Sequence, residues 1–277
     1  MVLFEYEQGG LWVHHTLDEV PNTENLKIHT HTGCELYCFL GGEGYYTVEG
    51  NHYLLTPGTI LLIRSGEAHM PHIRSTEPYE RIAVHFPLDY LADEDPSLTA
   101  LFDRRPLGAG NCYPPDPSDI DYLRSTLLRL CDPATPPTEG RIRAYLIPVL
   151  YELAGRRGQN ADTVSTRPHD PLVTDIIGYI NAHLTEEFDL DELSRRFFFS
   201  KSHINKVFRA ETGSSVWDYV VVKRLHLARS LLHSGVSAAG AAARSGFSDY
   251  SSFFRLYRRR FGVSPAKDKG NSGHDPL

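Results

Sequence analysis

The sequence contains few cysteines and no long uninterrupted run of apolar residues. Its four cysteines, Cys34, Cys38, Cys112 and Cys131, lack the paired C-x-x-C spacing of zinc sites and redox pairs, so reduced thiols are expected. No stretch approaches the roughly 20 apolar residues that a membrane-spanning helix requires. The N-terminus also lacks a basic segment followed by an apolar run, which argues against a signal peptide. These absences predict a cytoplasmic protein with no membrane partner.

Charge is distributed unevenly along the 277 residues, which carry a net charge of −7. Residues 1–166 hold 12 basic and 23 acidic residues, a net charge of −11, whereas residues 195–269 hold 15 basic and 4 acidic residues, a net charge of +11. The length suffices for two domains that each bury a core. An acidic domain joined to a basic one is expected when only the second meets phosphates.

The first hundred residues predict an antiparallel β-barrel or sandwich. Short β-rich runs at 36–40, 45–48, 53–55 and 60–63 are separated by turns that contain Gly or Pro. The barrel is expected to span about residues 1–110. Together with the helices that follow, it makes an α+β chain of two domains.

A helical hairpin is predicted over about residues 117–157, which closes a first domain at 157. Apolar residues recur at helical spacing from Ile120 to Cys131 and from Ile142 to Leu153. These stripes either pack on the barrel or form a self-association face, and a homodimer through the hairpin is expected. The polar segment 158–171 follows and predicts a linker.

The second domain is expected at 172–266, and its first part predicts a helix-turn-helix unit. Asp189 and Glu192 form a capping box for a short helix. Ser200 is expected to cap a second helix that runs to Thr212 and ends at Gly213. The polar and basic residues on its outer side are Ser202, His203, Asn205, Lys206 and Arg209. Such a helix fits the DNA major groove, although a solvated amphipathic helix would show the same pattern.

A second copy of the unit favours the DNA-binding interpretation. After a long helix over about 216–232, a short helix covers about 238–244, and Gly246 makes the turn. Ser248 is expected to cap a last helix from Asp249 to Phe261. The candidate residues on its outer side are Ser251, Ser252, Phe254, Arg255, Arg258 and Arg259. Residues 267–277 are expected to form a flexible tail.

The string GFSDYSSFFRLYRRRFGVSP (246–265) resembles the C-terminal signature of the AraC-type (AraC/XylS) transcription regulators, and FSKSHINKVFRAETG (199–213) resembles the equivalent part of the first unit. The resemblance implies two recognition helices that enter successive major grooves. The first would read DNA with Ser202, His203, Asn205 and Lys206, and the second with Ser251, Ser252, Phe254 and Arg255. One departure is the run AAGAAA (238–243), in which Gly240 costs about 1 kcal/mol relative to Ala. It predicts a looser second unit.

The N-terminal half resembles the cupin superfamily, whose barrels are common sensor domains in AraC-type regulators. His29-x-His31-x-x-x-Glu35 resembles the first cupin motif, and the stretch that ends at His69 resembles the second, with Arg64 where Pro is usual. The resemblance implies a metal set of His29, His31, Glu35 and His69, which suits Zn, Ni, Mn or Fe. The alternative is that these residues are polar pocket groups that bind no metal.

The barrel interior is the expected effector pocket. Its candidate lining residues are Tyr37, Phe39, Tyr46, Arg64, His69 and His72. Aromatic faces beside Arg and His suit a sugar or a small carboxylate.

The favoured function is a transcription regulator, not an enzyme, that binds double-stranded DNA and a small-molecule effector, with RNA polymerase as a further candidate partner. A metal-dependent cupin enzyme with an accessory DNA-binding domain is the alternative, although no acid/base or nucleophile constellation supports it. A methyl-repair regulator is a third reading, but it would need an activated cysteine in a dedicated context.

Overall fold

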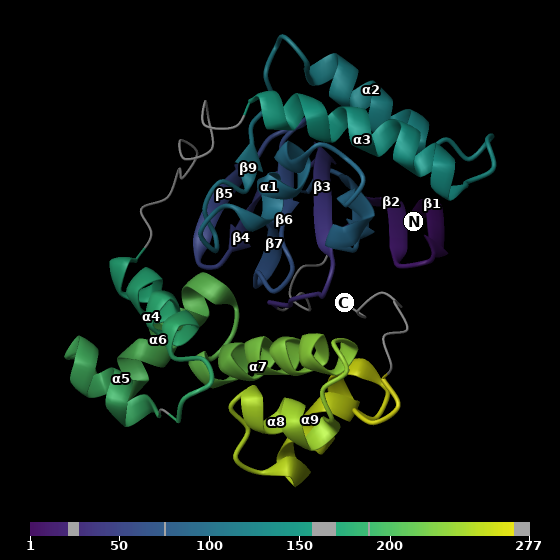
Figure 1. Ribbon diagram of the computed structural model, residues 1–277. Helices are drawn as coiled ribbons and strands as arrows, with labels where there is room; N and C mark the ends of the chain where they lie inside the picture. The colour runs from purple at the N-terminus through teal and green to yellow at the C-terminus, as the bar shows by residue number, and fades with distance from the viewer. Residues whose placement is uncertain (22–27, 75, 157–169, 188, 269–277) are drawn as a thin grey trace.

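The computed structural model describes residues 1–21, 28–74, 76–156, 170–187 and 189–268. Figure 1 shows a β-rich region from the first part of the chain lying above a group of helices from the last part. The two-domain α+β organisation expected from the sequence is confirmed. Within the described ranges, no helix is long and apolar enough to cross a membrane.

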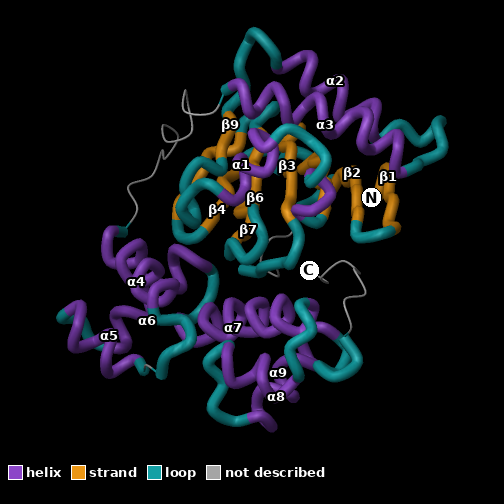
Figure 2. The backbone as a smooth tube through the Cα atoms, in the orientation of Figure 1, coloured by secondary structure: helices purple, strands orange, loops and turns teal. Residues whose placement is uncertain are grey.

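The β-rich region consists of two antiparallel sheets (Figure 2). One has the strand order β1-β2-β8-β3-β6-β9 and the other the order β5-β4-β7. The strands are β1 (Val2–Gln8), β2 (Leu11–Asp18), β3 (Cys34–Gly41), β4 (Gly44–Val48), β5 (Asn51–Leu55), β6 (Ile60–Ile63), β7 (His69–Ile73), β8 (Tyr79–Phe86) and β9 (Cys112–Tyr113). The four predicted runs correspond to β3, β4, β5 and β6. The sequence analysis did not assign the remaining strands, which include β1, β2, β7 and β8.

Strand β3 shows why these runs are apolar on both faces. Its side chains alternate between the two faces of the sheet. Leu36 joins the cluster that includes the helices, whereas Tyr37 joins a second cluster with Tyr46 and Tyr53 of the opposite sheet. The two sheets therefore pack face to face around a buried interior, and helices cover the outer face of the larger sheet.

The helices of this domain are η1 (Leu88–Leu91), α1 (Pro96–Asp103), α2 (Ile120–Leu130) and α3 (Glu139–Gly155). Helices α2 and α3 form the expected hairpin and lie across the top of the β-rich region in Figure 1. Their apolar stripes, including Leu127, Leu146 and Leu150, are buried in the same cluster as β3. Of the two alternatives for these stripes, packing on the barrel is the one that the structure shows.

The first helical unit contains α4 (Pro171–Ala182), α5 (Leu190–Phe197) and α6 (Lys201–Thr212). Asp189 and Ser200 are N-caps as predicted, because Asp189 accepts from Glu192 N at 2.9 Å and Ser200 accepts from His203 N at 3.2 Å. The Glu192 carboxylate, which a full capping box would place on Asp189 N, accepts from Tyr179 OH at 2.5 Å. Gly213 ends α6 with a φ of 70°, which suits a residue without a Cβ atom. The predicted linker falls mainly on residues 157–169, outside the described residues, and α4 already begins at Pro171.

The second unit contains α8 (Ala238–Arg244) and α9 (Tyr250–Phe261), joined to the first by α7 (Val216–His233). The predicted cap of the last helix was wrong by one residue. Asp249, not Ser248, is the N-cap, because its carboxylate accepts from Ser251 N at 3.2 Å and from Ser252 N at 2.7 Å. Two accepted hydrogen bonds satisfy two backbone donors that the helix itself leaves unpaired.

Two side chains that the sequence analysis did not single out tie the helices together. Arg224 of α7 donates to Leu184 O at 2.8 Å, to Glu186 O at 2.6 Å and to Gly246 O at 2.7 Å, so it bridges both units. The structure extends two residues into the predicted tail, and Asp268 there is buried.

Asp268 accepts from Arg229 Nε at 3.0 Å and from Tyr257 OH at 2.6 Å, and His233 Nε2 lies 3.1 Å from its second oxygen. It thereby fastens α9 to α7. Burial raises the pKa of Asp268, but the hydrogen bonds from Tyr257 and His233, with the charge of Arg229, outweigh it and lower the pKa.

We predict that Asp268→Ala destabilises the second unit by about 2–4 kcal/mol, because it leaves the Arg229 charge buried without its carboxylate. Urea unfolding followed by circular dichroism measures this. The stabilisation is present above the unfolded pKa, about 3.9, and is lost as the pH falls through the lower folded pKa. Asp191→Asn, which breaks an exposed pair with Lys201, is the control and should cost less than about 1 kcal/mol. Equal losses in both variants would refute the role of Asp268.

Candidate functional site

Helix α6 presents most of its own candidate DNA-binding residues to solvent. Ser202, His203, Lys206 and Arg209 are exposed, and the His203 ring stacks on Phe199 with centroids 4.9 Å apart. Asn205 differs from them, because it is half-buried and its Oδ1 accepts from Val216 N at 3.3 Å. That bond caps the start of α7, so Asn205 has a structural contact as well as a predicted reading role.

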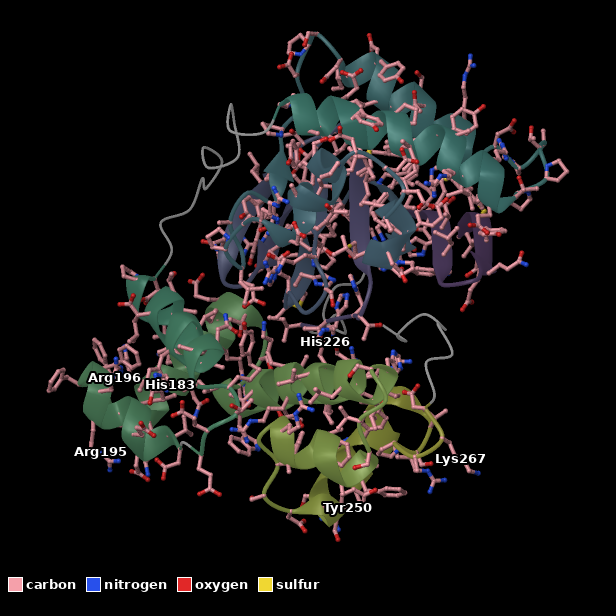
Figure 3. The ribbon with its side chains drawn as sticks, in the orientation of Figure 1. His183, Arg195, Arg196, His226, Tyr250 and Lys267 are labelled. Atoms are coloured by element: carbon pink, nitrogen blue, oxygen red, sulfur yellow. The ribbon has the colours of Figure 1, made fainter. Side chains whose placement is uncertain are left out.

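Helix α9 presents the second candidate set. Ser251, Arg255, Arg258 and Arg259 are exposed, whereas Ser252 and Phe254 are half-buried. Arg255 Nη2 donates to Ser252 Oγ at 3.0 Å, which holds the guanidinium near the start of the helix. Figure 3 labels Tyr250, the first residue of α9, at the edge of the molecule away from the β-rich region.

The basic residues of the two helices differ from the buried basic residues of the chain. Lys223 and Arg229 are each paired with a carboxylate. Among the described residues, no ion pair includes Arg209, Arg258 or Arg259. Exposed guanidinium groups without carboxylate partners are suited to bind phosphate oxygens.

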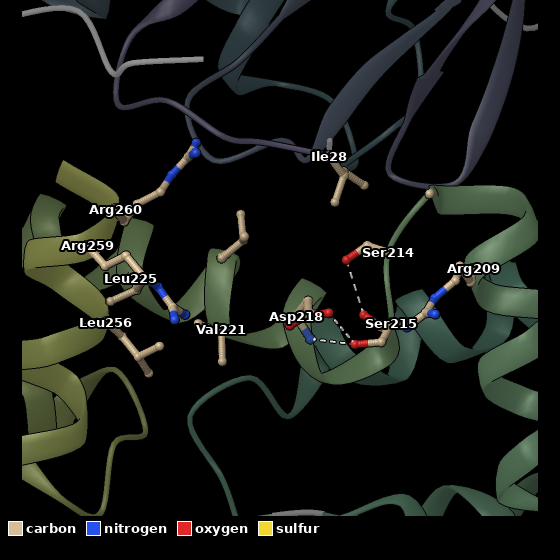
Figure 4. A pocket seen from close by; sticks show the side chains of 12 residues that line it. Ile28, Arg209, Ser214, Ser215, Asp218, Val221, Leu225, Leu256, Arg259 and Arg260 are labelled. Carbon is tan, nitrogen blue, oxygen red and sulfur yellow. Dashed lines mark hydrogen bonds between the residues drawn. The ribbon is translucent and has the colours of Figure 1, made fainter. Parts of the chain in front are cut away.

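A pocket of about 510 Å³ lies between the two helical units, beside α7 (Figure 4). Arg209 of α6 stands on one side, Arg259 and Arg260 of α9 stand on the other, and Ile28 of the β-rich domain lies above. The remaining lining residues are Gly213, Ser214, Ser215, Asp218, Val221, Val222, Leu225 and Leu256. The β-rich domain therefore sits directly over the space between α6 and α9.

A second candidate site is a buried cluster of His31, Glu35 and His69, whose ligand atoms all lie within 4.8 Å of one another. Glu35 Oε2 is 3.1 Å from His31 Nε2 and 3.4 Å from His69 Nε2. The two Nδ1 atoms are held by backbone oxygens, that of His31 by Gly33 O at 2.9 Å and that of His69 by Glu67 O at 2.7 Å. This pairing directs both Nε2 atoms to the centre, as in metal sites.

Two other histidines surround this cluster. His29, which was expected in the metal set, lies outside the three-residue group, although its ring packs on His69 with centroids 4.2 Å apart. His85 was missed, and its Nε2 lies 3.8 Å from Glu35 Oε1. Strand pairing is the signal that would have identified His85. His85 of β8 lies directly opposite Glu35 of β3, and residues opposite each other in paired strands point to the same face of the sheet. Burial raises the pKa of Glu35, but the neighbouring His85, His31 and His69 lower it well below its usual value.

The barrel interior contains a cavity of about 40 Å³ next to this cluster. Of the predicted lining residues, Tyr37 and Tyr46 line it. His14, His85 and Arg81 also line it and were missed. The volume is far below the roughly 300–1,000 Å³ of most ligand pockets, so this conformation has room for a very small ligand only.

The other predicted lining residues do not line this cavity. Phe39 is fully buried in the core between the sheets. Arg64 donates to Arg105 O at 2.9 Å, and His72 stacks on Tyr45 with centroids 4.3 Å apart. Phe39 still faces the interior with Tyr37, since both belong to the cluster between the sheets, whereas Arg64 lies beyond the end of β6. The assignment of these residues to an effector pocket stays a prediction.

The four cysteines are buried and unpaired, as the sequence analysis expected. Burial raises the pKa of each thiol to about 12, so each is protonated at neutral pH. A protonated, buried thiol is a poor nucleophile. None of them has the activated environment that a methyl-accepting cysteine would need.

Comparisons with known proteins agree with both halves of this structure. A family model described as an AraC-like ligand binding domain matches residues 21–146, and one described as a helix-turn-helix domain matches residues 193–269. The transcriptional activator RhaS of Escherichia coli strain K12 / DH10B is 24% identical over 246 residues, which cover 86% of this chain and 85% of RhaS. The regulatory protein PocR of Salmonella typhimurium strain LT2 is 32% identical over 107 residues, covering 38% of this chain and 35% of PocR.

Two solved structures are also similar. The DNA-binding domain of AdpA, in complex with a target DNA, is 31% identical, with a TM-score of 0.34, and the match covers 36% of this chain and 90% of that one. ToxT from Vibrio cholerae O395 is 11% identical, with a TM-score of 0.40, and the match covers 94% of this chain and 97% of the ToxT chain. The matched families and relatives favour a regulator over a cupin enzyme. The chain therefore belongs to the AraC-type transcription regulators, with a ligand-binding domain followed by a helix-turn-helix domain that binds double-stranded DNA.

Proposed function

We propose that this regulator reads a specific DNA sequence with α6 and α9 and responds to a small ligand in the interior of its β-rich domain. The observation that carries the proposal is the exposure of two basic helices whose opposite faces are buried in separate cores. The proposed base-reading residues that are exposed are Ser202, His203, Lys206, Ser251 and Arg255. Asn205, Ser252 and Phe254, which are half-buried, complete the proposed set.

The two helices are proposed to contribute differently to binding. Helix α6 offers mainly polar side chains, which suit the donor and acceptor pattern of base edges. Helix α9 adds Arg258 and Arg259 in its last turns, and Arg209 lies in the last turn of α6. We assign these three arginines to the phosphates, which position the protein without reading sequence.

We predict that Arg258→Ala weakens binding to all duplexes about equally and lowers the slope of log K against log salt by about 1, because one phosphate contact is lost. His203→Ala should change the preferred sequence, recovered by selection from a random duplex pool, with less effect on that slope. Asn205→Ala should change the sequence preference and also destabilise the start of α7. Equal losses of sequence preference in Arg258→Ala and His203→Ala would contradict this assignment.

We also propose that His31, Glu35 and His69 bind a divalent transition metal. The separations of 3.1 Å and 3.4 Å between the ligand atoms are close to those of ligands that share one tetrahedral zinc ion at about 2.0–2.1 Å. The three residues and their backbone-held Nδ1 atoms therefore fit such an ion. When bound, the ion would supply a Lewis-acidic point for an anionic effector group.

We predict that zinc ions raise the melting temperature of the wild-type protein by several degrees, since saturation with metal at about 100 times Kd adds about 2.7 kcal/mol. His31→Ala should abolish this shift. His29→Ala should reduce it less, because His29 lies outside the three-residue cluster. His72→Ala, which removes a histidine that stacks on Tyr45 and does not belong to the cluster, serves as the control. Retention of the full shift in His31→Ala would exclude this metal site.

A small carboxylate is the effector class that we favour over a sugar. The cavity of about 40 Å³ is lined by Arg81 together with Tyr37 and Tyr46, which are donors for a carboxylate. A sugar would require the sheets to separate. A homodimer, contact with RNA polymerase and a cytoplasmic location are proposed from the family. Because the hairpin stripes are buried, a dimer would use the outer faces of α2 and α3, where Tyr122 and Tyr151 are exposed.

A further inference from the structure

The carboxylate of Glu49 joins the two domains. Glu49 lies in the turn between β4 and β5, has a φ of 49°, and is 3% exposed. Its two oxygens accept from Lys223 Nζ at 2.6 Å and from Tyr219 OH at 2.6 Å, both in α7. Asn181 Nδ2 of α4 donates to it at 3.0 Å. A buried residue of the ligand-binding domain is thus held by three side chains of the DNA-binding domain.

The segment from Gly66 to His69 completes this contact from the ligand-binding side. Ala68 N donates to Glu49 Oε1 at 2.7 Å, and Gly66 O accepts from Lys223 Nζ at 2.8 Å. Figure 3 labels His226, the next α7 residue facing this segment, at the junction of the two domains. There Ser65 Oγ lies 3.4 Å from His226 Nε2, and burial lowers the pKa of His226 to about 3.

Apolar contacts reinforce the polar ones. Ala68 and Ile28 of the ligand-binding domain belong to the same buried cluster as Ile177 and Phe208 of the first helical unit and Val220 of α7. The cluster of the second unit contains no residue of the ligand-binding domain within the described part of the chain. Among the described residues, the shared apolar cluster therefore joins the ligand-binding domain to the first unit and α7, and not to the apolar cluster of the second unit.

The Glu49 contact makes this docking specific. Burying a carboxylate and an ammonium is costly unless each charge is fully hydrogen-bonded, and loss of one partner leaves the other uncompensated. Here the neighbouring Lys223 outweighs burial and lowers the pKa of Glu49. Glu49 is therefore ionised while the domains are docked.

The docked arrangement places an acidic domain over the pocket that Arg209 and Arg259 flank. Residues 1–166 carry a net charge of −11, and Ile28 lies over the pocket between Arg209 and Arg259. On α6 itself, Glu211 is held by His52 of the ligand-binding domain, with 2.7 Å between Oε2 and Nε2. Net negative charge on a covering domain weakens the attraction of these arginines for phosphates.

We propose that Glu49 is a positioning residue that clamps α7 to the ligand-binding domain through Lys223 and Tyr219, and that this clamp restrains DNA binding. Release of the clamp lets the basic domain move away from the acidic one. DNA affinity then rises without any change in the residues that touch DNA.

The test measures the affinity of the full-length protein for a fluorescein-labelled duplex of mixed sequence by fluorescence anisotropy. Glu49→Gln, Lys223→Met and Tyr219→Phe should each bind about 5-fold tighter or more than the wild type. Glu49→Gln raises the net charge by one, Lys223→Met lowers it by one, and Tyr219→Phe leaves it unchanged. Lys223→Met removes a positive charge, so tighter binding in this variant follows from undocking and not from charge alone.

The double variant Glu49→Gln/Lys223→Met should bind no tighter than either single variant, because the clamp is already open. Glu94→Gln is the matched control, since it breaks a carboxylate pair with Arg143 inside the ligand-binding domain and changes the charge as Glu49→Gln does. It should leave DNA affinity unchanged. Circular dichroism verifies that each variant folds. If Glu49→Gln or Lys223→Met does not fold, Tyr219→Phe decides the outcome, because it keeps the aromatic ring in the core. Unchanged or weaker binding by folded Lys223→Met or Tyr219→Phe overturns the proposal.

Discussion

The hydrogen-bonded carboxylate of Glu49 is the contact on which the arrangement of the two domains depends. It ties the turn between β4 and β5 to Lys223 and Tyr219 of the helix that connects the two DNA-binding units. Because α7 also anchors the second unit through Arg224 and through Arg229, its position sets the position of both candidate reading helices. A restraint on one helix therefore acts on the whole DNA-binding domain.

The same contact lies close to the candidate metal cluster. Ala68, which donates to Glu49, immediately precedes His69 of the cluster. The segment is held by Glu67, which accepts from Arg105 and from Asn111 Nδ2 at 2.8 Å in the interior of the ligand-binding domain. A short, buried segment thus has the metal cluster at one end and the domain interface at the other. A ligand that shifts His69 would act on the interface without a longer path through the barrel.

Local features of the fold could be predicted from the sequence, because they depend on neighbouring residues. Capping by Asp189 and Ser200, the helix end at Gly213, and the turns between β3 and β6 follow from residue types at fixed spacing. The metal candidates His31, Glu35 and His69 were found through a motif that resembles the cupin pattern, and the structure brings these three together.

The remaining features depend on contacts between segments that are distant in the sequence. His85 reaches Glu35 only through the pairing of β3 with β8, and His29 lies outside the three-residue cluster. Glu49 occupies what reads as an ordinary turn, and Asp268 lies in what reads as a polar tail. Their roles can be predicted only when the position of the partner helix α7 is known. Neither the periodicity of apolar residues nor capping chemistry gives that position.

The central claim is that the ligand-binding domain and the first DNA-binding unit are docked as one body around Glu49 and a shared apolar cluster. Differential scanning calorimetry of the intact protein tests it most directly. The account predicts that these two parts unfold in a single cooperative transition and that Glu49→Gln separates it into two. Two separate transitions in the wild-type protein, unaffected by Glu49→Gln, would contradict the account.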